Sequence, residues 1–134
     1  MSVIDISKIK GARINEPYGR TVKVILAPDT QDQIKDLSIT MGIIDPHSRN
    51  DLHTHEGYEL LYIVSGYGKG VIGDTTYDIK PDCLIIASPG VKHCQINESD
   101  DTMKMYCVWT PAVTGKDVLN RALIAAGQKE VTKI

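Results

Sequence analysis

The sequence predicts an all-β fold, either a barrel or a sandwich, followed by one helix near the C-terminus. The first supporting observation is a series of short segments rich in Val, Ile, Leu, Tyr and Thr, separated by Gly, Pro and Asp turn signals. The second is a single stretch with helical periodicity over residues 115–127. A length of 134 residues with 42% hydrophobic content is typical of one globular domain, so we expect residues 1–134 to form one unit with a barrel core at about 20–111.

The first part of the chain contains two clear strand patterns. Residues 3–10 alternate apolar and polar side chains, which is typical of either a short edge strand or an arm. Residues 21–26 predict a strand that ends before Pro28. Residues 37–44 predict another, with its odd-numbered apolar side chains on one face, and this strand ends before Pro46.

The second part continues the same pattern and then changes period. Further strands are expected over residues 60–64, 67–72, 75–79, 83–87, 93–97 and 103–110. Gly73 and Asp74 separate two of them and predict a β-hairpin. Both faces of 103–110 are largely apolar, so the pattern leaves open which face is the inner one. The predicted helix over 115–127 carries one apolar stripe, and Gly127 is a suitable residue for its C-terminal end.

Composition excludes several partner classes. The chain has 15 basic and 17 acidic residues, a net charge of −2, so no electrostatic feature favours nucleic acid or an anionic membrane. The N-terminus has no continuous apolar segment of the signal-peptide kind, and no apolar run approaches the length of a membrane span. We therefore expect a cytoplasmic protein, in which Cys83, Cys94 and Cys107 are reduced thiols.

Four side chains are interpreted as one metal site: His53, His55, Glu59 and His93. Residues two apart on a strand point the same way, so His53 and His55 can direct two imidazoles at one point. Glu59 enters the following strand beside them, and His93 supplies a third imidazole from a distant strand. Isolated histidines are usually surface or core residues, but two histidines and a carboxylate on one face are typical ligands of a divalent transition metal.

The two segments that hold these residues resemble the two motifs of the cupin family. The first motif corresponds here to His53, His55, Glu59 and Gly66, and the second to Gly90, His93 and Asn97. The departures are at glycine and proline positions: His47 and Asp82 stand where the motifs begin with Gly, and Ser88 stands where the second has Pro. The resemblance is to small single-domain cupins of the conserved-barrel type, and it implies a double-stranded β-helix (jelly-roll) barrel with one metal ion inside.

The resemblance also implies a range of functions. Its metal would be one divalent ion of Fe, Mn, Ni, Zn, Co or Cu, and its enzymes include dioxygenases, isomerases, lyases and decarboxylases acting on small polar organic substrates. The alternative is a non-catalytic cupin that binds or senses a sugar or organic acid. Residues 109–117 also resemble the end of cupin cyclases of the ectoine synthase type, although the metal-motif histidines of those cyclases are arranged differently.

Three further residues are candidates for substrate binding. His47 and Arg49 lie in the polar segment that leads into His53, where they can bind an anionic group at the mouth of the pocket. Gln95 shares the face of His93 by strand parity, and it either lines the pocket or bonds to neighbouring backbone. On family grounds, the arm at residues 3–10 predicts a homodimer.

Overall fold

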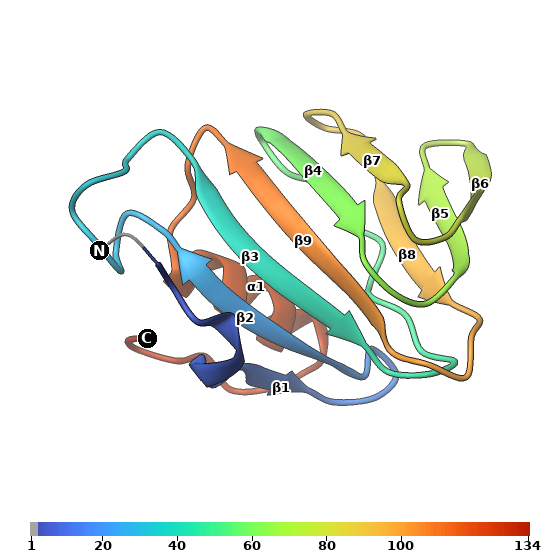
Figure 1. Cartoon of the computed structure of the whole chain (residues 1–134), viewed down its shortest axis with the longest axis horizontal. Helices are drawn as coiled ribbons and strands as arrows, with labels where there is room; N and C mark the ends of the chain where they lie inside the picture. The colour runs from blue at the N-terminus through green and yellow to red at the C-terminus, as the bar shows by residue number, and fades with distance from the viewer. Residues whose placement is uncertain (1–2) are drawn as a thin grey trace.

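The computed structural model describes residues 3–134 and consists of two antiparallel β-sheets, one short 3₁₀-helix and one α-helix (Figure 1). The elements are η1 (Ile6–Lys8), β1 (Ala12–Ile14), β2 (Arg20–Leu26), β3 (Ser38–Ile44), β4 (Tyr58–Ile63), β5 (Gly68–Ile72), β6 (Thr75–Ile79), β7 (Leu84–Ala87), β8 (His93–Asn97), β9 (Met103–Thr110) and α1 (Gly115–Ala125). The larger sheet has the order β1-β2-β3-β9-β4-β7 and the smaller one the order β6-β5-β8. The predicted all-β class is confirmed.

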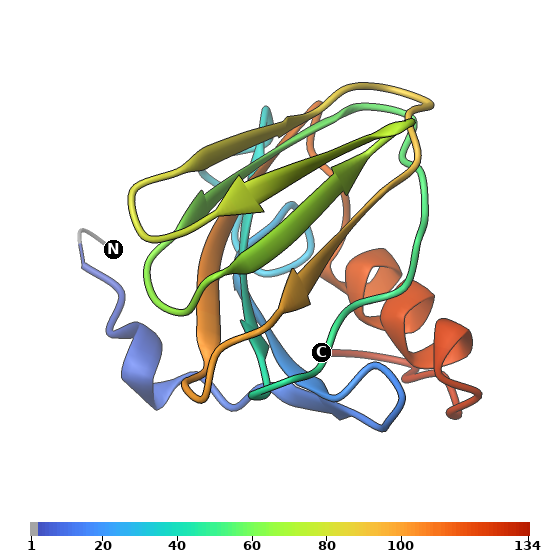
Figure 2. The same ribbon diagram turned by 90° about the vertical axis from the view of Figure 1, so that its right-hand side faces the viewer.

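The smaller sheet faces only part of the larger one (Figure 2). The core between the sheets is built from the inward residues of β4, β7 and β9, including Leu61, Ile63, Ile85 and Met105. The inner face of β9 is therefore the one that carries Met103, Met105, Cys107 and Trp109, which answers the question that the sequence left open.

Helix α1 covers the part of the larger sheet that the smaller sheet does not reach (Figures 1 and 2). Its buried Leu119, Ala122 and Leu123 pack on Ile14 of β1 and Val22 of β2 as a second core. The predicted helix is confirmed, and Gly127 follows it with a φ of +70°, the left-handed conformation that commonly ends a helix. Among residues 3–134, no helix has the length and apolar character needed to cross a bilayer.

The N-terminal segment over residues 3–10 forms no strand. Residues 6–8 form η1, capped by the side chain of Asp5, which accepts a hydrogen bond from the amide of Ser7 at 3.1 Å. Val3 and Ile4 precede it with exposed side chains. Of the two expectations for residues 3–10, the edge strand is not formed, because the segment holds η1 and no strand; the arm stays a prediction.

Candidate metal centre

The loop between β3 and β4 lies alongside β8 and behaves as an additional irregular strand. His53 and His93 face each other across this pairing, and the amide of each donates to the carbonyl oxygen of the other at 3.2 and 2.9 Å. Residues that pair directly across two strands present their side chains on the same face. The pairing therefore brings the imidazoles of His53 and His93 to one point between the two sheets.

His55 and Glu59 complete a cluster of four donors. The Nε2 atoms of His53 and His55 are 3.0 Å apart, and Glu59 Oε1 lies 3.1 Å from His55 Nε2 and 3.3 Å from His93 Nε2. All four donor atoms lie within 4.8 Å of one another. Two ligands about 2.1 Å from one metal ion are about 3.0 Å apart at a right angle and about 3.4 Å at the tetrahedral angle. The four residues predicted as ligands are thus brought together at separations that suit one ion.

Backbone carbonyl groups fix which ring nitrogen is available on two of the histidines. His53 Nδ1 lies 2.6 Å from the carbonyl oxygen of Asp51, and His93 Nδ1 lies 3.0 Å from that of Val91. A carbonyl oxygen only accepts, so each Nδ1 carries the hydrogen and donates it. The neutral ring then keeps its lone pair on Nε2, the atom that points into the cluster. Metal-binding histidines usually donate their other ring N–H to a carbonyl or carboxylate oxygen in this way.

The charges within the cluster favour a cation beside Glu59. Burial raises the pKa of Glu59, but hydrogen bonds from His55 and His93 outweigh it and lower that pKa to about 2. Burial and the charge of Arg121 lower the pKa of His53 to about 3, so its ring is neutral. Burial also lowers the pKa of His93, but its hydrogen bonds to Glu59 and Val91 and the charge of Glu59 together raise that pKa above its ordinary value. A buried carboxylate needs a cationic partner, which a divalent ion or a protonated His93 can supply.

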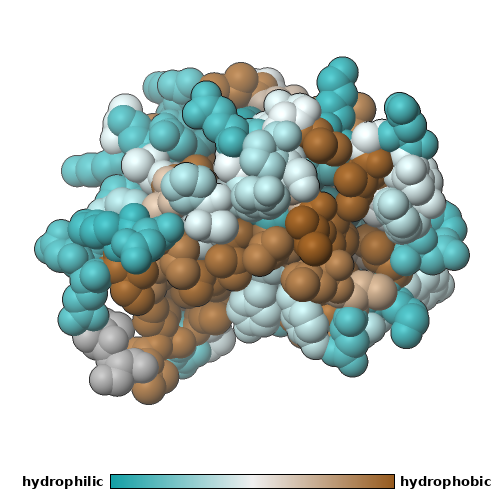
Figure 3. Space-filling model, turned by 90° about the horizontal axis from the view of Figure 1, so that it is seen from above, coloured by the Kyte–Doolittle hydropathy of each residue, from teal (hydrophilic) through white to brown (hydrophobic). Residues whose placement is uncertain are grey.

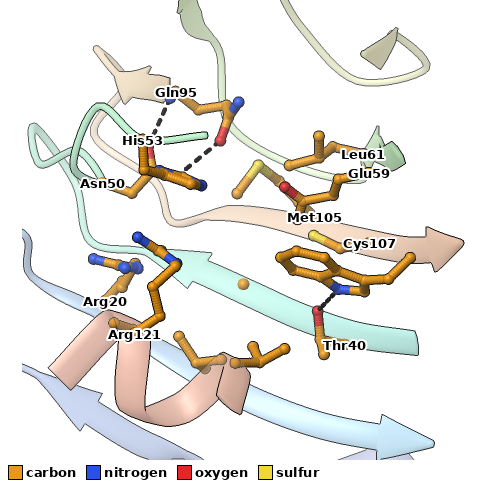
Figure 4. A pocket seen from close by; sticks show the side chains of 15 residues that line it. Arg20, Thr40, Asn50, His53, Glu59, Leu61, Gln95, Met105, Cys107 and Arg121 are labelled. Carbon is orange, nitrogen blue, oxygen red and sulfur yellow. Dashed lines mark hydrogen bonds between the residues drawn. The ribbon is translucent and has the colours of Figure 1, made fainter. Parts of the chain in front are cut away.

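A cavity of about 50 Å³ lies beside the cluster, between the larger sheet, β8 and α1 (Figure 4). His53 and Glu59 form part of its wall, and Trp109 and Arg121 are shared with an adjoining outer pocket of about 210 Å³ that reaches His55. A water molecule needs a cavity of roughly 10–15 Å³. The inner cavity therefore has room for a small chemical group, and the outer pocket has room for the remainder of a small molecule.

Two arginines line this cavity beside His53, on the side away from Glu59 and Leu61 (Figure 4). Arg20 Nη2 lies 3.4 Å and Arg121 Nη1 2.8 Å from the two carboxylate oxygens of Asp51. Burial lowers the pKa of Arg20 to about 10 despite the charge of Asp51, so this guanidinium stays protonated at neutral pH. Two cations share one anion here, which leaves a net positive charge facing the cavity.

No sequence pattern predicts this arginine pair, and only one of the three predicted substrate-binding residues lines the cavity. Gln95 is fully buried and lines the inner cavity, as strand parity allowed. His47 is exposed with its Nε2 2.6 Å from Asp100 Oδ1, and Arg49 is exposed with Nη2 3.4 Å from Cys94 Sγ. Neither His47 nor Arg49 lines the cavity.

The metal-type cluster inside a two-sheet barrel defines the class of protein. A family model described as "Cupin domain" matches residues 40–109, which is more than half of the chain. The chain belongs to the cupin family, and its double-stranded β-helix fold and its likeness to RmlC-like barrels are confirmed.

The chain is similar to named proteins in both sequence and structure. The chain is 40% identical over 107 residues to a protein named L-ectoine synthase from Aliivibrio fischeri (strain MJ11), covering 79% of this chain and 80% of that protein. Among solved structures, ectoine synthase from P. lautus is similar with a TM-score of 0.70 and 23% identity over 88% of this chain and 83% of that one. A predicted oxalate decarboxylase from Thermotoga maritima gives a TM-score of 0.72 and 23% identity over 81% and 98%. These two structures support the fold alone.

Proposed function

We propose that this protein is a metal-dependent enzyme that acts on a small carboxylate-bearing molecule. Its metal ligands are His53, His55, Glu59 and His93, and the ion is a divalent transition metal. The observation that carries the proposal is the convergence of four donors at the wall of a cavity that is also lined by two buried or half-buried arginines.

The names of the curated relatives suggest cyclisation as the reaction class. L-ectoine is a small cyclic amidine with one carboxylate, which matches a pocket with a cationic side and a metal-binding side. A bound metal ion would act as a Lewis acid that polarises an oxygen of the substrate. Arg20 and Arg121 orient the carboxylate, and Trp109, held by a 3.0 Å hydrogen bond from its Nε1 to Thr40 Oγ1, helps exclude water. The arrangement of three histidines is the feature by which this chain would differ from those cyclases.

Elemental analysis tests the metal centre. Protein purified without added metal is expected to carry about one transition-metal ion per chain, and His53→Ala, His93→Ala and Glu59→Gln are each expected to lower this at least tenfold. His47→Ala is the matched control, because His47 is exposed and bonds outside the cluster. Full metal retention in the three ligand variants would contradict the assignment.

Ligand binding and turnover test the enzyme. We expect L-ectoine to raise the melting temperature of the metal-loaded protein, and proton NMR to detect slow ring opening, since an enzyme catalyses both directions of its reaction. Arg121→Gln should weaken binding about tenfold by removing a charge-assisted hydrogen bond. Arg49→Gln should not, because Arg49 does not line the cavity. Binding with no turnover would favour the non-catalytic sensing alternative.

We also propose that two copies associate. The outer face of the larger sheet leaves Leu84 57%, Ile86 54% and Tyr62 41% exposed, and apolar surface extends across much of one edge of the molecule (Figure 3). Light scattering is expected to give twice the chain mass of 14.7 kDa. Ile86→Lys should shift this to the mass of one chain, and an unchanged mass would exclude this face. The cytoplasmic location stays a prediction.

A further inference from the structure

His55 differs from the other two histidines of the cluster in how its ring is supported. His53 and His93 pair across two strand segments, and each donates its Nδ1 hydrogen to a backbone carbonyl oxygen. His55 lies in the loop beyond this pairing. Among residues 3–134, its ring makes contacts of hydrogen-bond length only through Nε2, to His53 and Glu59. Metal-binding histidines are usually oriented through their other ring nitrogen, so the orientation of His55 needs a different support.

Outside the cluster, the indole of Trp109 packs against this ring. The two ring centroids are 4.5 Å apart and the ring planes meet at 71°, which is an edge-to-face contact. Trp109 lies on β9 directly opposite Glu59 of β4, so the two side chains leave the larger sheet on the same face. The indole is buried, with 7% of the residue exposed. A large, confined aromatic ring therefore stands beside His55.

Thr40 of β3 determines how this indole lies. Trp109 Nε1 donates to Thr40 Oγ1 at 3.0 Å, the bond drawn to Thr40 in Figure 4, and Thr40 is buried. Across the β3–β9 pairing, Ser38 is opposite Trp109 and Thr40 is opposite Cys107, so Thr40 is the diagonal neighbour of the indole on the same face. A buried indole N–H needs an acceptor. The rotamer that reaches Thr40 is therefore favoured, and it is the one that contacts His55.

We propose that Trp109 and Thr40 are positioning residues for His55: the Thr40 hydroxyl orients the indole, and the indole holds the imidazole toward the cluster. This rests on the proposed function, in which His55 is a metal ligand. The indole restrains the ring by packing rather than by accepting a hydrogen bond. Its loss should therefore weaken metal binding by about three- to tenfold, the range of one edge-to-face aromatic contact.

Titration of the metal-free protein with Co²⁺ tests this, because the visible absorption of bound Co²⁺ changes with the number and arrangement of its ligands. Thr40→Val removes the acceptor and keeps the branched shape. It should weaken Co²⁺ binding about three- to tenfold and shift the absorption toward that of His55→Ala. Thr40→Ser keeps the hydrogen bond and should stay within about twofold of the wild type. Ser99→Ala is the matched control and should match the wild type, because its buried hydroxyl bonds to Asn97 and Asp101, outside the cluster.

A double-mutant cycle separates positioning from a general loss of stability. If Thr40 acts through His55, adding Thr40→Val to His55→Ala should weaken Co²⁺ binding no further. The same fold-loss in both backgrounds would overturn the proposal, because Thr40 would then act on the fold as a whole. If circular dichroism shows that Thr40→Val folds poorly, Trp109→Phe loses the same hydrogen bond and takes its place in the cycle with the same expectations.

The outcomes also separate this proposal from the metal centre. Weaker Co²⁺ binding in His55→Ala, with wild-type affinity and absorption in Thr40→Val, would overturn the positioning role and leave the metal centre standing. If His55→Ala binds Co²⁺ as tightly as the wild type, His55 is no ligand and the positioning role fails with it. If the wild type binds no Co²⁺, the metal centre and the positioning role both fail.

Discussion

Asp51 connects the two halves of the candidate site at the level of single residues. Its carboxylate accepts from Arg20 and Arg121, and its carbonyl oxygen accepts from Nδ1 of His53. Burial raises the pKa of Asp51, but the charge and hydrogen bond of Arg121 lower it by more, so the group is ionised. Asp51 thus sets both the position of the arginines and the tautomer of His53, a proposed metal ligand.

Replacing this carboxylate should be costly. Asp51→Asn leaves the buried Arg20 without its anion, and losing one partner of a buried pair typically costs about 3–5 kcal/mol. Because the side chain of Arg121 is 32% exposed, we expect about 2–4 kcal/mol, measured by urea unfolding at pH 7. Asp78→Asn, which breaks the exposed pair with Lys69, should cost far less, because water screens that pair. Equal losses in the two variants would contradict the special role of Asp51.

The four candidate metal ligands can be predicted from the sequence, whereas the arginines cannot. The spacing of His53, His55 and Glu59 is local, and strand parity carries the same information to Gln95 beside His93. The convergence of residues 20, 51 and 121 has no local signature, since it arises only when α1 folds against the larger sheet. The loop before His53 has no periodicity either, and a φ of +57° at His47 turns that side chain to solvent.

Among the elements, α1 deserves a direct test because it forms one wall of the cavity. Thr114 Oγ1 caps it by accepting from the amide of Asp117 at 3.1 Å. Asp29 adds a second cap from far along the chain, accepting from Gly115 and Lys116 at 2.7 and 3.1 Å. Two caps on one short helix indicate that its N-terminus is held firmly against the loop after β2.

Removing the local cap should loosen this wall. Thr114→Ala is expected to lower the free energy of unfolding by about 1 kcal/mol, whereas Thr114→Ser keeps the oxygen and should lose only a few tenths. Chemical denaturation measures both. Loss of the cap should also quicken amide hydrogen exchange in the first turn of α1, the helix that carries Arg121. This effect is expected in Thr114→Ala alone. Identical stability of the alanine and serine variants would show that Asp29 caps the helix by itself.

Strand β3 shows what cannot be predicted from an alternating sequence pattern. Its alternation was predicted, with the odd-numbered apolar residues on one face. The structure buries the polar Ser38 and Thr40 of the even-numbered face, because Ser38 Oγ donates to the carbonyl oxygen of Val113 at 2.5 Å and Thr40 accepts from Trp109 at 3.0 Å. An alternating pattern identifies two faces, but only the partners of each face decide which one lines a cavity.

For the whole molecule, the unequal width of the two sheets creates the site. The smaller sheet covers the β9, β4 and β7 side, and α1 covers the β1 and β2 side (Figure 2). The cavity is lined by residues from both regions. Its walls therefore come from elements spread over the sequence from residue 20 to residue 122. The fold class and strand order of a barrel follow from pattern and family, whereas this gap follows from packing.

The edge of the larger sheet gives the whole chain a pH-dependent contribution to stability. Arg13 of β1 donates to both carboxylate oxygens of Asp45, which follows β3, with Nη1 2.8 Å from Oδ1. The hydrogen bond from Arg13 outweighs partial burial and lowers the pKa of Asp45. A carboxyl group with a lowered pKa in the folded state stabilises that state above its unfolded pKa of about 3.9, and this stabilisation is lost as the pH falls through the folded value.

Asp45→Asn should therefore destabilise the protein at pH 7 and make little difference in acid. Both side chains are partly exposed, 52% for Arg13 and 30% for Asp45, so we expect less than about 1 kcal/mol at pH 7. The difference between the wild type and Asp45→Asn should shrink below about pH 4 as the wild-type carboxyl group protonates. Urea unfolding at several pH values measures it, with the exposed Asp36→Asn as control. A difference that stays constant from pH 7 into acid would mean that the asparagine acts through packing rather than through loss of the charge.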